Sequence, residues 1–133
     1  MPMPMPMLMP ESIRINRARD VISLKFADSD EIDICAELLR IMSPSAEVRG
    51  HKPNEAKLQT GKRNVIIKSI RKTGNYALRI YFDDGHDSGI YSWDYLHDLA
   101  VNQAIYWSQY LKELHKAGGS RDPETRVIKI FDP

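Results

Sequence analysis

FDDGHDSGIYSWDYL, the stretch from Phe82 to Leu96, combines a hairpin turn, a histidine and the start of a helix. Gly85 follows an aspartate, and this Asp-Gly pair is typical of tight hairpins because glycine accepts a positive φ without a Cβ clash. Ser88 to Tyr91 is the expected return strand. Ser92 is expected to cap the next helix, since its hydroxyl can accept a hydrogen bond from an early helical amide. The stretch therefore predicts a strand, a turn that carries His86, a second strand and a helix.

Alternating apolar and polar residues before this stretch predict further antiparallel strands, because a strand that buries one face repeats every two residues. Turns are expected at residues 16–20, 28–30 and 72–75. A short helix is expected over Ala36 to Met42, and it should end before Pro44 because the residue before a proline avoids the helical region. These elements predict an α+β fold with one antiparallel sheet of about five strands. The apolar strand residues are Ile13, Ile15, Ile22, Leu24, Phe26, Ile32, Ile34, Tyr76, Leu78, Ile80 and Phe82, together with the stretch from Val65 to Ile70.

The C-terminal side of the stretch is expected to form one long helix, Trp93 to Leu114, packed on one face of the sheet. Gly118 and Gly119 should end it. The segment from Ser45 to Asn64 is expected to be an irregular polar loop, of a length that is often functional. Apolar residues recur along the helix at a spacing of 3.6 residues, which is typical of core packing. This stripe comprises Trp93, Leu96, Ala100, Ala104, Trp107, Leu111 and Leu114.

The 133 residues are expected to form a single domain. Alternating methionine and proline at the N-terminus predict a flexible leader over residues 1–12. The domain is expected over residues 13–118, followed by a tail over residues 119–133. Within the tail, Val127 to Phe131 is expected either to add an edge strand or to trail along the surface.

Composition excludes several classes of protein. Nineteen basic and eighteen acidic side chains give a formal net charge of +1, so no global field attracts nucleic acid or an anionic membrane. Cys35 is the single cysteine, which excludes an internal disulfide and favours a cytoplasmic location. We expect its thiol to be buried and inert. No apolar stretch approaches the ~20 residues of a membrane-spanning helix, so no membrane partner is expected.

Three segments of the chain together resemble a known family. These segments are Leu38 to His51, Asn75 to Ile80 and Asp83 to Leu96. They resemble the gamma-butyrobetaine hydroxylase-like N-terminal domain, and the similarity covers about Ile13 to Gly118. The resemblance implies a domain that occurs beside the catalytic jelly roll of 2-oxoglutarate dioxygenases and also fused to scaffold ATPases of iron-sulfur cluster assembly. Small bacterial members consist of little else.

The resemblance also implies a structural zinc site in the dioxygenases, formed by a Cys-x-Cys-x-x-Cys run and a distant histidine. These four positions fall on Ser43, Ser45, Val48 and His86 of this chain. Serine hydroxyls are poor zinc ligands and valine is none, so a tetrahedral site of this kind is not expected here. No cofactor is expected, although zinc or iron remains an open alternative.

Three interpretations of His86 compete. The first is a turn residue that is hydrogen-bonded to the loop from Ser43 to Ser45. The second is an adapted iron or zinc site, because histidine with carboxylates is a usable ligand set. The third is a general base. Carboxylates for the second interpretation are Glu47, Asp83, Asp84 and Asp87.

The function expected first is a non-catalytic binding or adaptor module. No phosphate-binding glycine loop and no legible catalytic triad occurs in the sequence, so we do not expect an enzyme. The resemblance implies a domain that occurs beside unrelated active sites, which suggests that the domain binds other proteins. The expected partner is a cluster-assembly ATPase or a metalloenzyme. Tyr81, Tyr91 and Trp93 are expected to be aromatic anchors. The expected interaction surface comprises Ser43, Ser45, Glu47, Arg49, His51, Asp84, His86, Tyr91 and Trp93.

Two other classes remain open. A metal-binding protein related to 2-oxoglutarate dioxygenases would hold iron or zinc at His86. A nucleic-acid-binding module would use the basic residues between Arg49 and Arg63 and is the least favoured, since nearby glutamates dilute their charge.

Overall fold

The computed structural model describes residues 9–27, 29–50 and 56–123, and within them it shows two antiparallel sheets. The α+β class and the antiparallel pairing are therefore as predicted, but the single sheet of about five strands is wrong. Each sheet has three strands in sequential order, β1-β2-β3 and β4-β5-β6. The strands are β1 (Ser12–Ile15), β2 (Val21–Lys25), β3 (Ile32–Cys35), β4 (Ile67–Thr73), β5 (Ala77–Phe82) and β6 (Gly89–Ser92).

The two sheets meet at the turn between β1 and β2 rather than along a shared strand. Arg19 sits in this turn with a positive φ of 62°. Its carbonyl oxygen accepts a hydrogen bond from the Ile67 amide at 2.8 Å, and its guanidinium donates to the Lys68 carbonyl at 2.9 Å. Strand alternation predicts that a segment is a strand, but it does not predict which strands pair. Along the chain, the first sheet ends with β3 and the second begins with β4. The long segment that joins these two strands contains two helices.

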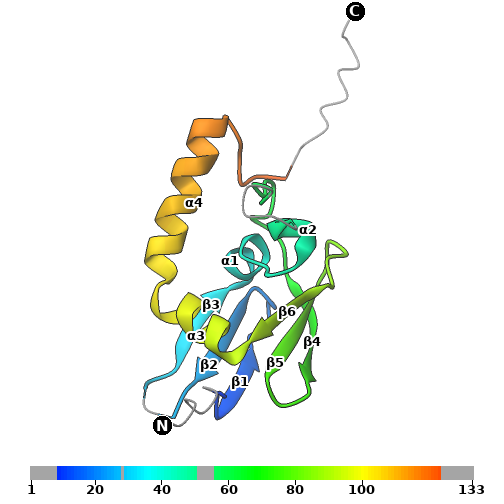
Figure 1. Cartoon of the computed structure of the whole chain (residues 1–133), viewed down its shortest axis with the longest axis vertical. Coiled ribbons are helices and arrows are strands. Elements are labelled where there is room, and N and C mark those ends of the chain that lie inside the picture. The colour runs from blue at the N-terminus through cyan, green and yellow to red at the C-terminus, as the bar shows by residue number, and fades with distance from the viewer. Residues whose placement is uncertain (1–8, 28, 51–55, 124–133) are drawn as a thin grey trace, which may run out of the picture.

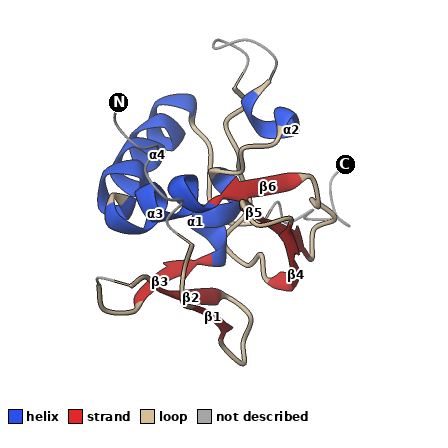
Figure 2. Cartoon of the chain, turned by 60° about the horizontal axis from the view of Figure 1, so that its bottom comes forward, coloured by secondary structure: helices blue, strands red, loops and turns tan. Residues whose placement is uncertain are grey.

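Four helices complete the fold: α1 (Ala36–Ile41), α2 (Ala46–Arg49), α3 (Trp93–Val101) and α4 (Gln103–Ala117). The short helix after the third strand is present as predicted, with Cys35 as its N-cap. The Cys35 sulfur accepts a hydrogen bond from the Leu38 amide at 3.4 Å, and the residue is exposed rather than buried. Helix α2 lies in the segment that was predicted to be irregular. Figure 2 shows α1, α3 and α4 together, with α2 apart from them, and both cartoons place α2 near the start of β6 (Figures 1 and 2).

The predicted long helix is divided at Asn102. This residue has φ −115° and ψ 18°, and its amide and side chain both bond to Asp98, the side chain at 2.8 Å. The break rotates the buried face of the second helix relative to the first. The predicted stripe therefore holds for Trp93, Leu96, Ala100 and Leu114, and Trp107 is half-buried. It fails at Ala104 and Leu111, which are exposed, while Tyr110 outside the stripe is buried.

The core lies between the inner faces of the sheets and the helices. Alternation along β2 and β5 is confirmed, since every second residue there is buried. Tyr76 is an exception, because it lies in the turn before β5 and is 52% exposed. The largest fully buried side chains are Ile22, Leu24, Phe26, Ile34, Leu38, Leu39, Ile67, Ile80, Tyr91, Trp93, Leu96 and Leu99.

Described residues on either side of the predicted domain also belong to the folded structure. Pro10 is buried and β1 begins at Ser12, within the predicted leader, while residues 1–8 lie outside the described residues. Past the end of α4, the carbonyls of Ser120 and Arg121 accept hydrogen bonds from the amides of Gly61 and Arg63, both at 2.9 Å. The start of the predicted tail therefore packs on the domain. The predicted strand at residues 127–131 lies outside the described part of the chain.

Arg121 fastens this segment to two helices. Its guanidinium donates to both Glu37 carboxylate oxygens in α1, at 2.8 and 2.7 Å. It also lies over the Trp107 ring of α4, 4.7 Å from the ring centroid. Glu37 is only 5% exposed, so the pair satisfies a buried carboxylate. No described helix is both long and apolar enough to cross a bilayer.

We predict that Arg121→Ala lowers the free energy of unfolding by about 2 kcal/mol, because it leaves the buried Glu37 carboxylate without its partner. Urea unfolding at neutral pH measures this. The matched control is Arg63→Ala, which removes a solvent-exposed ion pair with Asp122 and should cost less than about 0.5 kcal/mol. Equal losses in the two variants would show that the Glu37 pair is not a special contact.

Candidate functional site

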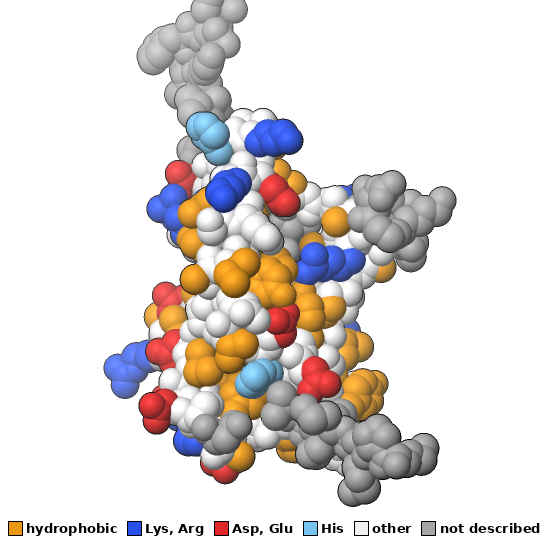
Figure 3. Space-filling view, turned by 60° about the vertical axis from the view of Figure 1, so that its left-hand side comes forward, with side chains coloured by type: hydrophobic (Ala, Val, Ile, Leu, Met, Phe, Trp, Pro, Cys, Tyr) orange, Lys and Arg blue, Asp and Glu red, His pale blue; other side chains and the backbone are white. Residues whose placement is uncertain are grey.

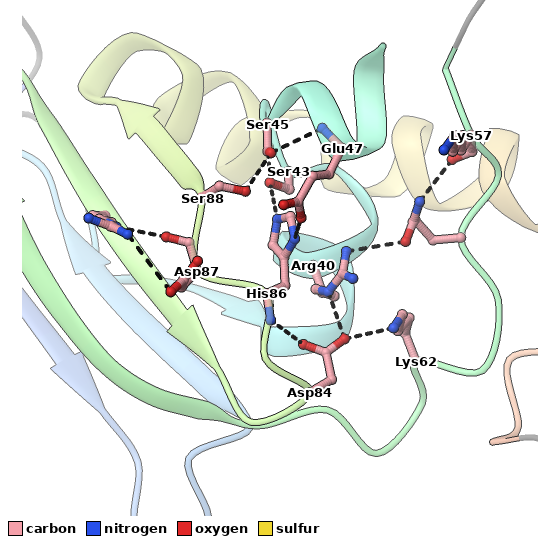
Figure 4. Close-up of polar contacts among 12 residues, drawn as sticks. Arg40, Ser43, Ser45, Glu47, Lys57, Lys62, Asp84, His86, Asp87 and Ser88 are labelled. Carbon is pink, nitrogen blue, oxygen red and sulfur yellow. Dashed lines mark hydrogen bonds and ion pairs between the residues drawn. The ribbon is translucent and has the colours of Figure 1, made fainter.

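The hairpin that joins β5 and β6 meets the segment around α2 through a set of polar side chains that we call the polar clasp. It comprises Ser43, Ser45, Glu47, His86 and Ser88 (Figure 4). The His86 ring lies between the two segments, with Nε2 2.8 Å from Ser43 Oγ and Nδ1 3.0 Å from a Glu47 carboxylate oxygen. The hydroxyls of Ser45 and Ser88 lie 2.6 Å apart. The predicted hydrogen bond between His86 and the loop from Ser43 is therefore present.

Local backbone structure places each member of the polar clasp. Ser45 is the N-cap of α2, and its hydroxyl accepts a hydrogen bond from the Glu47 amide at 3.2 Å. On the hairpin side, Gly85 has a φ of 90°, a conformation that favours glycine. The connection spans residues 83–88, so β6 begins one residue later than the return strand that was predicted from Ser88. This turn directs His86 inward, where it is 4% exposed.

Proton positions in the clasp follow from the chemistry of its members. The Glu47 carboxylate only accepts, so the neutral His86 ring carries its proton on Nδ1. Nε2 is then the acceptor for the Ser43 hydroxyl, and Ser43 Oγ in turn accepts from the Ser45 amide at 3.3 Å. Burial of the ring lowers the pKa of His86, and the nearby Arg40 cation adds to this, although Glu47 and Asp84 oppose it.

A second polar group supports the same hairpin. The Asp84 carboxylate accepts from Arg40 of α1 at 2.9 Å and from Lys62 at 2.6 Å, and its other oxygen accepts from the His86 amide at 3.2 Å. Burial alone would raise the pKa of Asp84, but the hydrogen bonds from Lys62 and His86 and the Arg40 cation together lower it. Asp84 therefore remains ionised and ties α1 and the segment before β4 to the turn.

The interior around Ser43 is tightly packed. Ser43 is fully buried, and a Cβ on Gly89 would lie only 2.7 Å from its hydroxyl oxygen. Tyr91 closes the same space, with its hydroxyl donating to the Leu39 carbonyl at 2.5 Å. Glu47, His86 and Ser43 are connected in the order of a hydrolytic triad. The packing leaves no room for a substrate at Ser43 Oγ.

The residues at the family's metal positions do not fit a tetrahedral zinc. Both ring nitrogens of His86 are occupied by protein partners, and Val48 is an apolar side chain that is 3% exposed. Carboxylates that an adapted site would need have other partners, since Asp83 accepts from the Ile66 amide at 2.9 Å and Asp87 lies 3.9 Å from Arg79. Among the described residues, no three His, Cys, Asp or Glu side chains form a group that could hold a metal.

The predicted interaction surface is only partly at the surface. Tyr91 and Trp93 are 0% and 1% exposed, so their assignment as exposed anchors is wrong. Tyr91 is at a buried position of the alternating strand β6, and Trp93 is in the first turn of α3, so both side chains point inward. The Trp93 indole donates to the Asn75 carbonyl at 2.8 Å. Tyr81 is half-buried under the Arg79 guanidinium, which is 4.8 Å from its ring centroid. His51 lies outside the described residues.

Other members of the predicted surface divide between interior and rim. Ser43, Ser45 and His86 are buried, whereas the Glu47 side chain is 68% exposed. The sequence prediction missed Arg40, Lys62, Ser88 and Tyr95. Ser88 lies within the quoted family segment and could have been found from it. Arg40 and Tyr95 lie within the quoted segments as well. Lys62 had no such signal, because it lies outside them and its partner is distant in the sequence.

Comparison with known proteins supports the family resemblance of the three sequence segments quoted above. Residues 13–97 match the family model described as gamma-butyrobetaine hydroxylase-like, N-terminal. The chain belongs to this family. No protein with a curated description matches it.

Solved structures of similar chains have the same fold. One NMR solution structure is 44% identical, covers 96% of this chain and 100% of its own, and superposes with a TM-score of 0.78. A second NMR structure is 38% identical over 100% of this chain and 99% of its own, with a TM-score of 0.76. A crystal structure from Acidithiobacillus ferrooxidans ATCC 23270 is 30% identical over 70% of this chain and 93% of its own, with a TM-score of 0.59. That protein is described as a member of the DUF971 family with unknown function.

We predict that folding stability falls when the pH drops below the ordinary histidine pKa of 6.5, because the folded state holds His86 with a lowered pKa. The unfolded chain then binds a proton that the folded chain resists. This contribution is complete above 6.5 and is lost as the pH falls through the lowered value. Urea unfolding at about pH 7.5 and about pH 5.5 measures it.

The His86→Gln variant tests the assignment, since glutamine does not titrate. The difference in unfolding free energy between the two pH values should shrink in this variant. His115→Gln is the matched control, because His115 is exposed on α4, and it should leave the difference unchanged. An unchanged difference in His86→Gln would show that another group causes the pH dependence.

Proposed function

We propose that this chain is a non-catalytic protein-binding module of the cytoplasm, accessory to iron-sulfur cluster assembly or to a metalloenzyme partner. The observation that carries the proposal is the use of Ser43, His86 and Glu47. Serine, histidine and glutamate are common catalytic residues. Here Ser43 and His86 are buried, and the hydrogen bonds among Ser43, His86 and Glu47 hold α2 on the hairpin. The polar clasp thus holds α2 in a fixed position on the hairpin, and this position exposes a surface. The surface it presents is the outer side of α2 and the adjoining turn.

Several exposed groups lie at this surface. Ala46 and Glu47 are exposed on α2, Arg49 is half-buried at its end, and the Asp84 side chain in the turn is 23% exposed. These rim residues replace Tyr91 and Trp93 as the candidates for partner contact. Reuse of the domain beside dioxygenases and scaffold ATPases, as the family resemblance implies, supports a docking role over a reaction of its own.

Neither alternative function gains support from the geometry. A metal-binding protein would need the turn carboxylates to converge on His86, and they are directed to other partners. A nucleic-acid-binding loop would need most of the basic residues between Arg49 and Arg63 to be free of acidic partners, and two of them are not. Lys62 instead pairs with Asp84 at 2.6 Å and Arg63 with Asp122 at 2.7 Å.

We predict that a purified scaffold ATPase of cluster assembly, or the catalytic domain of a 2-oxoglutarate dioxygenase, binds the chain through α2. Titration of the ¹⁵N-labelled chain should shift the amide signals of α2 and of residues 83–88. The variant Ala46→Arg adds bulk and charge at the exposed face and should weaken binding by at least roughly tenfold.

Ala104→Arg is the matched control, because Ala104 is exposed on α4, and it should bind as the unmodified chain does. Absence of binding to either protein would contradict the proposed function. Equal weakening by both arginine variants would place the contact elsewhere.

A further inference from the structure

A groove of about 530 Å³ lies between α4 and the segment that follows α2. Aliphatic side chains, among them Met42 and Leu58, line it together with the rings of Tyr95, Tyr106 and Tyr110. The space-filling view of the face that carries α4 shows apolar side chains gathered across its middle (Figure 3). Arg49, at the end of α2, also lines the groove, so the groove is continuous with the proposed docking surface.

The tyrosine rings are fixed in place. The Tyr95 hydroxyl donates to the Met42 carbonyl at 2.5 Å, and the Tyr110 hydroxyl donates to the Gln59 carbonyl at 2.7 Å. The Tyr106 hydroxyl donates to the Asp98 carboxylate. Each polar end is therefore satisfied within the protein, and the rings present apolar surface to an occupant. Rigid aromatic walls of this kind bind apolar groups at low entropic cost.

Two cations at the groove have no acidic partner among the described residues. Arg49 donates from Nη2 to the Tyr95 hydroxyl at 2.5 Å, a neutral acceptor. Within the described part of the chain, Lys57 forms hydrogen bonds only through its backbone: its amide donates to the Val48 carbonyl at 2.7 Å, and its carbonyl accepts from the Gln59 side chain at 3.1 Å. A half-buried guanidinium is best satisfied by a carboxylate, whose two oxygens match its planar donors. An occupant of this groove is therefore expected to bring a carboxylate next to an apolar group.

The groove is lined by residues from two turns of α4. Tyr106, Tyr110 and Glu113 line it at spacings of four and three residues, which corresponds to about 10 Å along a helix. An extended peptide covers that length in about three residues.

We propose that the groove binds a short extended segment of a partner protein, in which one or two apolar side chains adjoin an aspartate or glutamate. The apolar side chains lie against the tyrosine rings, and the carboxylate pairs with Arg49 and Lys57. This inference rests on the proposed function and names the part of the partner that is recognised.

The test uses the full chain labelled with ¹⁵N and the peptide acetyl-Ala-Leu-Phe-Asp-Gly-amide as the probe. Binding should shift the amide signals of Arg49, Lys57 and Tyr110. Replacing the peptide's aspartate by asparagine should weaken binding by at least roughly tenfold, because a charge-assisted pair is lost. Lys57→Gln and Arg49→Lys should each weaken binding several-fold, the latter because lysine lacks the planar fork.

Lys112→Gln, at an exposed position on α4 outside the groove, is the matched control and should bind as the unmodified chain does. Equal affinity for the aspartate and asparagine peptides would overturn the inference. Equal affinity for free 3-phenylpropionate and the peptide would also overturn it, because the groove would then be a small-molecule site. Changes at the same amides in Phe131→Ala without peptide would identify the chain's own C-terminal segment as the occupant and overturn it as well.

The two proposals fail in distinguishable ways. If the ATPase binds but Lys57→Gln and Arg49→Lys do not change its affinity, the docking function stands and the groove is not the contact. If the peptide binds as described but neither partner protein does, the groove is confirmed as a peptide site and the accessory role fails.

Discussion

The imidazole of His86 is the contact on which the position of α2 depends. One buried ring binds Ser43 through Nε2 and Glu47 through Nδ1, and these residues lie about forty positions away in the sequence. Helix α2 has only four residues, and isolated helices of this length are not stable in water. It therefore needs external contacts to persist. The hydrogen bond between Ser45 and Ser88 adds one. The ring connects the hairpin both to Ser43, two residues before the N-cap, and to Glu47 in the first turn of α2.

The position of α2 in turn shapes the surface beside it. Arg49 ends this helix and reaches the Tyr95 hydroxyl of α3, so the clasp and the groove are joined through a single turn of backbone. A shift of α2 would separate the cation from the aromatic wall. The polar residues at the positions that correspond to the metal site implied by the family resemblance thus act at a distance, by holding α2 and the proposed docking surface in place. Ser43 is fully buried, and Gly89 packs against it on the side of the hairpin.

Local pattern in the sequence predicted most elements but not their assembly. Alternation correctly predicted the buried residues of β2 and β5, because a strand's two faces differ whatever its partners are. It could not separate two sheets, since pairing depends on contacts such as that of Arg19 with Ile67. The contact of His86 with Ser43 was predicted through the family resemblance, whereas the groove was not predicted. Lys57 and Tyr110 are distant in sequence, and only the folded chain brings them together.

Amide hydrogen exchange in the His86→Ala variant tests the role of the ring most directly. The amides of Val48, Arg49 and Gly50 donate within α2 at 3.0, 2.9 and 2.8 Å, so they report the opening of this helix. We expect their exchange to accelerate by at least roughly tenfold more than that of the Ile80 amide in the core, because local opening needs less free energy than global unfolding. Acceleration by the same factor at all four amides, or at none, would contradict the account.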